Sequence, residues 1–265
     1  MNPILIISVS IIVLLSFIWY GLRIQPKPFS QPTFTQGETP TVVFPDNLPA
    51  PVERYYQTVY GEQIPVIKSV VITGRGWIRP FKIWLPTRFI FVHEAGVNYR
   101  HFFEATFFGF PFLKVNEGII NGASFFESPM ATYSNDPNTN QGANLALWAE
   151  GGWFPSIWLT DSRVTWEGLD DNTALLRVPF EKTSETFIVR FDPQNGMVNI
   201  LEAMRYKTPK DITKTLWIPS LKYDDKGNSV SYATWLDDGK PWAKLTLETI
   251  QINPDLLEYV FARGS

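Results

Sequence analysis

The sequence has no cysteine and only two histidines among its 265 residues. The lack of cysteine excludes disulfide bonds, thiol nucleophiles and metal sites built from thiolates. With so little histidine, few residues could build a nucleophilic triad, and the chain contains neither an H-E-x-x-H nor a G-x-S-x-G motif. We therefore predict no cofactor, and a non-catalytic protein rather than an enzyme.

An excess of positive charge is also missing. Asp and Glu number 26 against 23 Lys and Arg, which is a net charge of -3, so the chain lacks the strong positive field that attracts nucleic acid. Hydrophobic residues make up 45% of the chain, including 20 Phe, 10 Tyr and 10 Trp. This composition excludes an intrinsically disordered protein and is sufficient for a large core. Nucleic acid is not an expected partner.

The strongest local pattern is an apolar run near the N-terminus. Residues 4–22 carry no charge, and Trp19, Tyr20 and Arg23 stand at the end of the run. A helix of this length is about 28 Å long, which matches the hydrocarbon core of a bilayer. A cleaved signal peptide would instead need a basic start, a shorter apolar run and small residues at its end. Residues 1–23 are therefore predicted to be the uncleaved transmembrane anchor of a single-pass protein of the cell membrane.

A proline-rich segment follows the anchor. Seven of the 21 prolines lie at residues 26–51, and such a segment favours an extended polyproline conformation. We interpret residues 24–47 as a linker, although part of it could lie along the domain as an extended edge. A stalk of this kind favours an extracytoplasmic domain, whereas Arg23 and Lys27 favour the opposite orientation. We predict the extracytoplasmic orientation.

Residues 48–265 are predicted to form one β-rich globular domain. Its first element is a short helix, because apolar residues recur with helical spacing from Val52 to Val59. Four strands are then expected, at residues 66–76, 82–94, 99–108 and 115–126. A polar break at residues 134–142 is interpreted as a loop, and one or two short helical pieces follow it.

The second half of the domain is predicted to be an antiparallel meander. Its apolar segments alternate with short sequences rich in Asp, Asn and Gly, which are typical of hairpin turns. Four such turns are expected, at residues 170–172, 192–196, 224–228 and 237–240. Connections this short leave no room for the crossover helices of a parallel sheet.

Several strands of the first half are apolar on both sides. In residues 89–92 and 102–108 neither set of alternating positions is polar, although a sheet with one solvated face should alternate. Helices, a second layer of sheet or an apolar ligand must therefore cover the second face. We predict a mainly β fold, in which a curved antiparallel sheet forms a half-barrel or open barrel with short helices as its lid.

The two histidines are the first candidate site. His93 and His101 flank a hairpin turn that we expect to be centred on Val97, so that they would face one another near Glu104. Two imidazoles and a carboxylate can bind a metal ion or act as an acid and a base. A cross-strand pair without a ligand explains the same pattern, because the sequence does not fix a third ligand. We therefore predict no metal, with His93 and His101 as the candidate ligands if one is bound.

Glu150 is the second candidate, because it lies among aromatic residues. Trp148 precedes it, and Trp153 and Phe154 follow it. A carboxylate in such surroundings serves as a cap or an ion-pair partner, or it has a raised pKa and acts as an acid. Arg205 is a candidate partner for an ion pair.

A series of short motifs in the globular part carries a resemblance to a known family. The motifs are Leu48-Pro49-Ala50-Pro51, Phe108-Gly109-Phe110-Pro111, Ala149-Glu150-Gly151-Gly152-Trp153-Phe154-Pro155, Val164-Thr165-Trp166-Glu167 and Phe191-Asp192. In this order they resemble a family of bacterial membrane-anchored proteins that is known only as a domain of unknown function. The resemblance implies an N-terminal anchor and brings no catalytic residues. At the level of the fold, the order of elements also resembles the Lol-type lipoprotein carriers, whose half-barrel holds acyl chains.

These observations favour a membrane-tethered, non-catalytic module that binds a lipid or another apolar molecule in an aromatic-lined cavity. The expected ligand-binding residues are Phe91, Phe103, Phe107, Trp148, Glu150, Trp153, Phe154, Trp158 and Arg205. Two alternatives stay open. The first is a hydrolase-type enzyme that uses Glu150 or His93 and His101 as acid and base, and the second is a scaffold or assembly protein that docks through exposed aromatic side chains.

Overall fold

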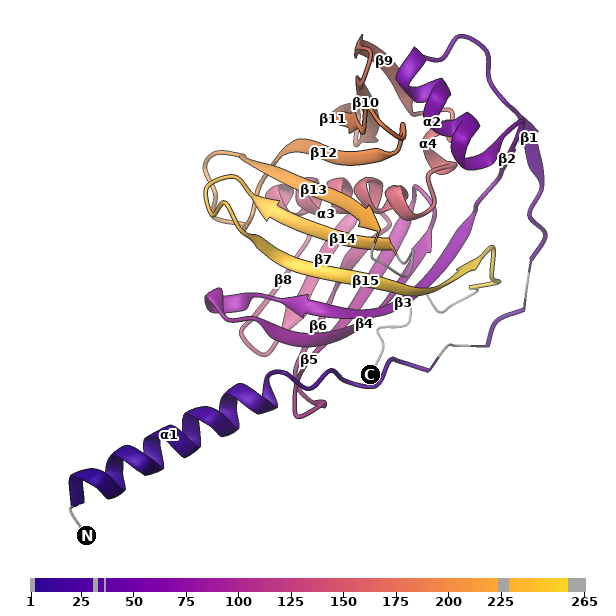
Figure 1. Cartoon of the computed structure of the whole chain (residues 1–265). Coiled ribbons are helices and arrows are strands. Elements are labelled where there is room, and N and C mark those ends of the chain that lie inside the picture. Colours follow the sequence, from indigo (N-terminus) through magenta and orange to yellow (C-terminus); the bar gives the residue numbers. More distant parts are fainter. Residues whose placement is uncertain (1–2, 31–32, 36, 224–228, 257–265) are drawn as a thin grey trace.

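One antiparallel sheet of 13 strands forms the domain. The structure, a computed structural model, describes residues 3–30, 33–35, 37–223 and 229–256. The sheet consists of two runs, β3 (Ser69–Ile78) to β8 (Ala131–Ser134) and β9 (Thr165–Asp170) to β15 (Pro241–Ile252), and within each run strands that follow one another in the chain pair with one another. Pairing of β3 with β15 joins the two runs. The sheet is curved and is not closed into a barrel (Figure 1). The predicted mainly β fold is confirmed.

The first run holds β3 (Ser69–Ile78), β4 (Leu85–Glu94), β5 (Asn98–Phe107), β6 (Phe110–Ile120), β7 (Ala123–Ser128) and β8 (Ala131–Ser134). The second run holds β9 (Thr165–Asp170), β10 (Thr173–Phe180), β11 (Thr183–Phe191), β12 (Val198–Arg205), β13 (Thr215–Tyr223), β14 (Ser229–Trp235) and β15 (Pro241–Ile252). A separate ladder pairs β1 (Thr41–Val43) with β2 (Gln63–Pro65).

Four α-helices occur in the described residues: α1 (Pro3–Gly21), α2 (Ala50–Tyr60), α3 (Pro137–Ala149) and α4 (Ile157–Thr160). Two single turns of 3-10 helix, η1 (Pro80–Lys82) and η2 (Glu150–Trp153), complete the elements. Helix α1 projects away from the domain, whereas α3 lies in the hollow of the sheet (Figure 1). There α3 contacts β6 and β7 of the first run and β10 and β12 of the second run.

Helix α3 begins within the segment that we expected to be a loop, residues 134–142. The carboxylate of Asp136 accepts hydrogen bonds from the backbone N–H groups of Asn138 and Thr139, and Pro137 occupies the first turn, so the segment has a complete helix start. Two of the polar residues that suggested a loop, Asn140 and Gln141, are buried against neighbouring strands. Asn140, for example, accepts a hydrogen bond from the backbone N–H of a β7 residue at 2.9 Å.

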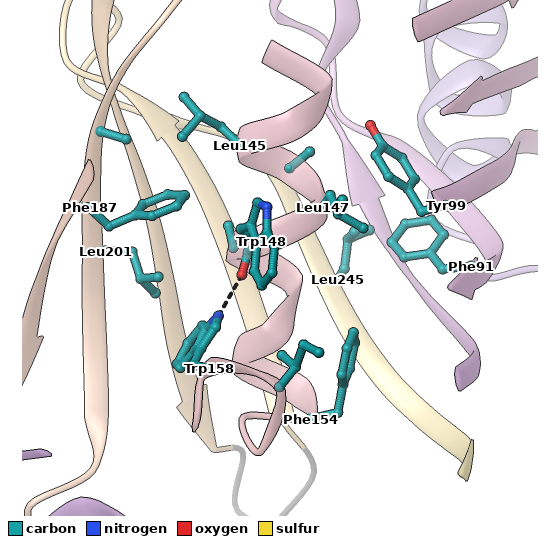
Figure 2. Close-up of a cluster of buried hydrophobic side chains, with 14 of the residues drawn as sticks. Phe91, Tyr99, Leu145, Leu147, Trp148, Phe154, Trp158, Phe187, Leu201 and Leu245 are labelled. Atoms are coloured by element: carbon teal, nitrogen blue, oxygen red, sulfur yellow. Dashed lines mark hydrogen bonds between the residues drawn. The ribbon is translucent and has the colours of Figure 1, made fainter. Parts of the chain in front are cut away.

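The core lies between α3 and the sheet, with Trp148 near its centre (Figure 2). Trp148 and Trp158 are each 1% exposed. The indole N–H of Trp158 donates a 2.9 Å hydrogen bond to the backbone carbonyl of Trp148, so α4 is attached to the end of α3. Side chains of both runs, among them Phe187 and Leu201 of the second, pack around this pair.

Two local predictions need correction. The predicted strand at residues 115–126 is two strands, β6 and β7, because Asn121 and Gly122 take positive φ values of 52° and 79° and form a turn between them. The hairpin between β4 and β5 is centred on Gly96 rather than on Val97, because Gly96 takes a φ of 70° that favours glycine. The predicted turn at residues 224–228 lies outside the described residues.

Helix α1 is the one helix of the described residues that is long and apolar enough to cross a membrane. Its side chains are almost entirely exposed, since only 6% of the apolar window is buried against the rest of the chain. The domain boundaries that we drew at residues 23 and 47 stay predictions.

Candidate functional site

A cavity of about 300 Å³ lies between the hollow face of the sheet and the end of α3. Aromatic and aliphatic side chains from both runs and from η2 form most of its wall: Phe91, Phe103, Phe126, Tyr133, Trp153, Leu201, Trp217, Leu221, Trp235, Trp242 and Leu245. A smaller polar group lies in the same wall: His101, Glu117, Glu150, Arg205 and Lys207. An apolar volume with a few polar groups is the usual form of a small-molecule site.

The structure brings five of the nine expected ligand-binding residues to this cavity: Phe91, Phe103, Glu150, Trp153 and Arg205. The other four are placed elsewhere. Trp148 and Trp158 belong to the core, and Phe154 packs edge-on against His93 at 5.2 Å between ring centroids. Phe107 contacts Phe17 of α1 at the far end of β5, with ring centroids 5.9 Å apart.

Sequence reasoning missed the tryptophans that the second run supplies. Trp217 and Trp235 are direct cross-strand partners on β13 and β14, and their rings lie 6.4 Å apart. Ser231, Ala233 and Trp235 occupy alternate positions of β14, so the sequence could have indicated that they share one face of the strand. All three line the cavity. The small residues among them leave room beside the large rings.

Both histidines of the chain meet Glu150 at one side of the cavity. His93 lies on β4, His101 on β5 and Glu150 at the start of η2. Nε2 of His101 is 2.7 Å from Oε2 of Glu150 and forms a hydrogen bond with it. Nε2 of His93 is 2.8 Å from the same oxygen, at ion-pair distance but without hydrogen-bond alignment. We call these three residues the His–Glu cluster.

The register of the hairpin explains how the two histidines meet. His93 is opposite Tyr99, and His101 is opposite Phe91, so the two imidazoles are diagonal neighbours on one face of the sheet, 5.7 Å apart between ring centroids. The expected proximity to Glu104 is wrong, because even-numbered residues of β5 point to the opposite face. Glu104 forms a salt bridge there with Arg88 at 2.6 Å.

The His–Glu cluster is electrostatically coupled. Burial raises the pKa of Glu150, but the attraction of His101 and the contacts with both imidazoles outweigh it and lower the pKa to about 2. Burial lowers the pKa of His101, yet Glu150 and Glu117 together raise it above its ordinary value. Burial dominates at His93 and lowers its pKa. The raised pKa that we considered for Glu150 is therefore corrected to a lowered one.

Arg205 lines the same cavity as the His–Glu cluster, and its described contacts are with aromatic rings. Its guanidinium stacks over Trp217, with the carbon 4.3 Å from the ring centroid, and the other side approaches Gly142 of α3. Among the described residues it makes neither a salt bridge nor a hydrogen bond, and burial lowers its pKa. The ion pair with Glu150 that we considered is not formed.

The family model that matches this chain is described as a family of unknown function (DUF6544), and the match spans residues 42–244. The chain belongs to this family. The resemblance expected from the sequence is thereby confirmed. The DUF6544 match contains the His–Glu cluster and Arg205, whereas α1 lies outside it. None of the curated proteins matches the sequence.

Two solved structures are similar to this member of DUF6544. One is a putative outer membrane lipoprotein-sorting protein domain from Vibrio parahaemolyticus, with 11% identity over 73% of this chain and 88% of that chain, at a TM-score of 0.39. The other is a LolA superfamily protein from Nitrosomonas europaea, with 12% identity over 73% and 89% of the two chains, at a TM-score of 0.40. These similarities concern the fold, and they agree with the Lol-type resemblance that we expected from the order of elements.

Proposed function

We propose that this protein is a membrane-tethered binding module whose cavity holds one apolar chain, such as the acyl chain of a lipid. The observation that carries the proposal is the cavity of about 300 Å³, whose wall is mostly aromatic and aliphatic. Its volume is at the lower end of the range for small-molecule sites. A single acyl chain or a compact apolar molecule therefore suits it better than a large ligand.

The polar part of the wall supports an amphiphilic ligand. A buried guanidinium without a counter-ion is costly, because its desolvation is not compensated. At the cavity wall, Nε of the part-buried Arg205 is shielded from solvent and has no hydrogen-bond partner among the described residues. A carboxylate or phosphate headgroup would supply the missing partner, with its apolar chain lying against the tryptophans of the second run. The proposed ligand is thus an anionic lipid or a fatty acid.

The tether is proposed to be α1, with the domain held close to the cell membrane on its extracytoplasmic side. The end of α1 contacts the turn between β5 and β6, where Phe108 lies 4.7 Å from Phe17 between ring centroids. Phe110 and Phe112 on the adjoining strand are 75% and 56% exposed. Exposed aromatic side chains beside an anchor are suited to the membrane interface.

The cavity can be tested by filling it. Ser231 of β14 points into the cavity, so Ser231→Trp places a large ring in the space that the ligand would occupy. Thr234→Trp on the same strand is the matched control, because this position is not part of the cavity wall. Full-length protein exchanged into amphipol is titrated with a fluorescent fatty acid. We expect Ser231→Trp to weaken binding at least tenfold and Thr234→Trp to leave it unchanged.

Two results would reject the proposed function. One is equal affinity of the wild type and Ser231→Trp, which would place the bound probe outside the cavity. The other is the absence of binding by wild-type protein to fatty acids and to total lipid extracts. Native mass spectrometry of the detergent-extracted chain provides an independent check, since a bound lipid adds a defined mass.

A further inference from the structure

We propose that His93, His101 and Glu150 form a site for one divalent transition-metal ion, with Zn²⁺ as the representative metal, and that an open coordination position of this ion faces the cavity. The site does not depend on the identity of the apolar ligand. Three observations support it: the ligand atoms of the three side chains lie close together, a carboxylate of Glu117 contacts the imidazole of His101, and the buried imidazole of His93 has no hydrogen bond within the described residues.

The donor atoms are those that such metals bind. Two imidazole nitrogens and one carboxylate oxygen lie within 4.8 Å of one another, and they come from three separate elements of the fold. This donor set suits zinc and other first-row divalent ions. Three protein ligands leave a tetrahedral ion one further position. His101 and Glu150 line the cavity, so the remaining position is accessible from it.

His101 is oriented as a metal-bound histidine is. Its Nδ1 lies 3.4 Å from a carboxylate oxygen of Glu117, which leaves Nε2 directed at the site. Metal-binding histidines commonly have a carboxylate on the nitrogen that does not bind the metal, because it sets the tautomer and the orientation of the ring. Phe91 stacks on the imidazole at 3.7 Å between centroids and restricts its rotation.

His93 supplies the independent observation. Its side chain is fully buried, and neither ring nitrogen has a hydrogen bond within the described part of the chain. Nε2 nevertheless lies 2.8 Å from a carboxylate oxygen of Glu150. If Nε2 carries the lone pair of the ring, it and the carboxylate repel one another at this distance, and a metal ion bound to both would remove the repulsion.

The two distances to Glu150 require a small adjustment of its side chain. Two ligand atoms at about 2.0–2.1 Å from a tetrahedral zinc ion are about 3.3 Å apart, whereas the carboxylate oxygen lies 2.7 and 2.8 Å from the two nitrogens. Glu150 must therefore retreat by roughly half an ångström. Its side chain is 17% exposed and lies on a single helical turn, so this movement does not disturb the sheet.

The composition makes the test direct, because the chain contains no other histidine and no cysteine. Full-length protein without a histidine tag is stripped with chelator in detergent and titrated with Zn²⁺ by calorimetry, and with Co²⁺ by visible absorption. We expect one ion per chain. His93→Gln and His101→Gln should each weaken binding at least 100-fold, and Glu117→Gln should weaken it about 10- to 100-fold. Glu94→Gln, beside His93 on β4, is the isosteric control and should bind as the wild type does.

The proposal is overturned if the wild type binds no Zn²⁺ at micromolar concentration, or if it binds the ion equally well without either histidine. Should the histidine variants fail to fold, X-ray absorption at the zinc edge of the wild type decides. Scattering from two imidazoles supports the site, and the absence of imidazole scattering rejects it. Fatty-acid binding by Ser231→Trp is measured separately, so failure of the metal site and failure of the lipid site are distinguishable.

Discussion

The two runs of the sheet differ in whether their outer face, which is the face turned away from α3, is covered by other parts of the chain. In β4 and β5 almost every residue is buried, whichever face it points to. In β11 and β12 buried and accessible positions alternate, so that Val189 is buried while its neighbour Arg190 is exposed. Within the part of the chain that the structure describes, β4 and β5 therefore have a second covering layer and β11 and β12 do not. The same two strands of the first run carry both histidines of the His–Glu cluster.

The covering layer comes from the proline-rich segment, part of which lies along the domain, and from Leu256 after β15. Among the described residues, this layer takes the place of the helices, second sheet or ligand that we had considered. Phe29 packs on Phe102 of β5, with ring centroids 5.7 Å apart. Phe34 packs on the buried side chains of the outer face, which include Phe102. Arg88 donates a 3.2 Å hydrogen bond to the carbonyl of Lys27 and stacks over Phe29. A strand that is apolar on both sides can thus indicate an extended segment that crosses its back.

The difference between the covered outer face of the first run and the open outer face of the second is tested most strongly by removing one aromatic ring from each of these faces. Phe102→Ala leaves a cavity beneath the proline-rich segment and should lower the free energy of unfolding by about 3 kcal/mol. Tyr232→Ala on β14 should lower it by less than about 1 kcal/mol, because that face is open to solvent. Urea unfolding of the full-length protein in detergent, followed by tryptophan fluorescence, measures both. Equal losses would show that the two outer faces are alike.

The covering layer itself is the next target. Phe29→Ala should destabilise the protein by about 1–2 kcal/mol, because the ring is half-buried and its removal exposes part of Phe102. Phe110→Ala is the matched control, since this ring is 75% exposed and should contribute little in detergent. If Phe29→Ala unfolds at the same urea concentration as the wild type, the segment does not stabilise the sheet.

The second run contributes the proposed headgroup contact. Arg205→Gln should weaken binding of a fatty acid about tenfold, which corresponds to about 1.4 kcal/mol. It should leave the binding of an uncharged apolar probe unchanged, because the aromatic wall is intact. Arg190→Gln, on the same run and paired with Glu202 at 2.8 Å, serves as the control. Loss of both ligands to the same extent would contradict a headgroup role.

Much of this fold could be predicted, because hairpin turns and apolar segments are local features. The position of α2 and the strands of the second run follow directly from them. The sequence allowed the linker to lie along the domain as an alternative, but it could not predict that the linker covers β4 and β5, because a contact between Phe29 and Phe102 depends on the path of an extended chain with no periodic pattern. Local rules have no information on such a contact.

The candidate site was predictable only in part for a similar reason. His93 and His101 were recognised as a pair, but their register depends on one glycine in the turn. Glu104 was wrongly included, because it is three residues from His101 on β5 and so points to the opposite face. Glu150 was singled out for its aromatic neighbours, yet its meeting with the histidines requires α3 to end in the hollow of the sheet. The relation between these three residues is a property of the tertiary structure.

The smallest expected effect concerns α3, the element that contacts both runs. Asp136→Ala removes the side chain that accepts hydrogen bonds from two backbone N–H groups at the start of the helix, and should cost about 1 kcal/mol of unfolding free energy. Asp136→Asn keeps a hydrogen-bond acceptor at the same position and should lower the free energy of unfolding by only a few tenths of a kcal/mol. If alanine is as well tolerated as asparagine, the start of α3 is set by its contacts with the two runs and not by its cap.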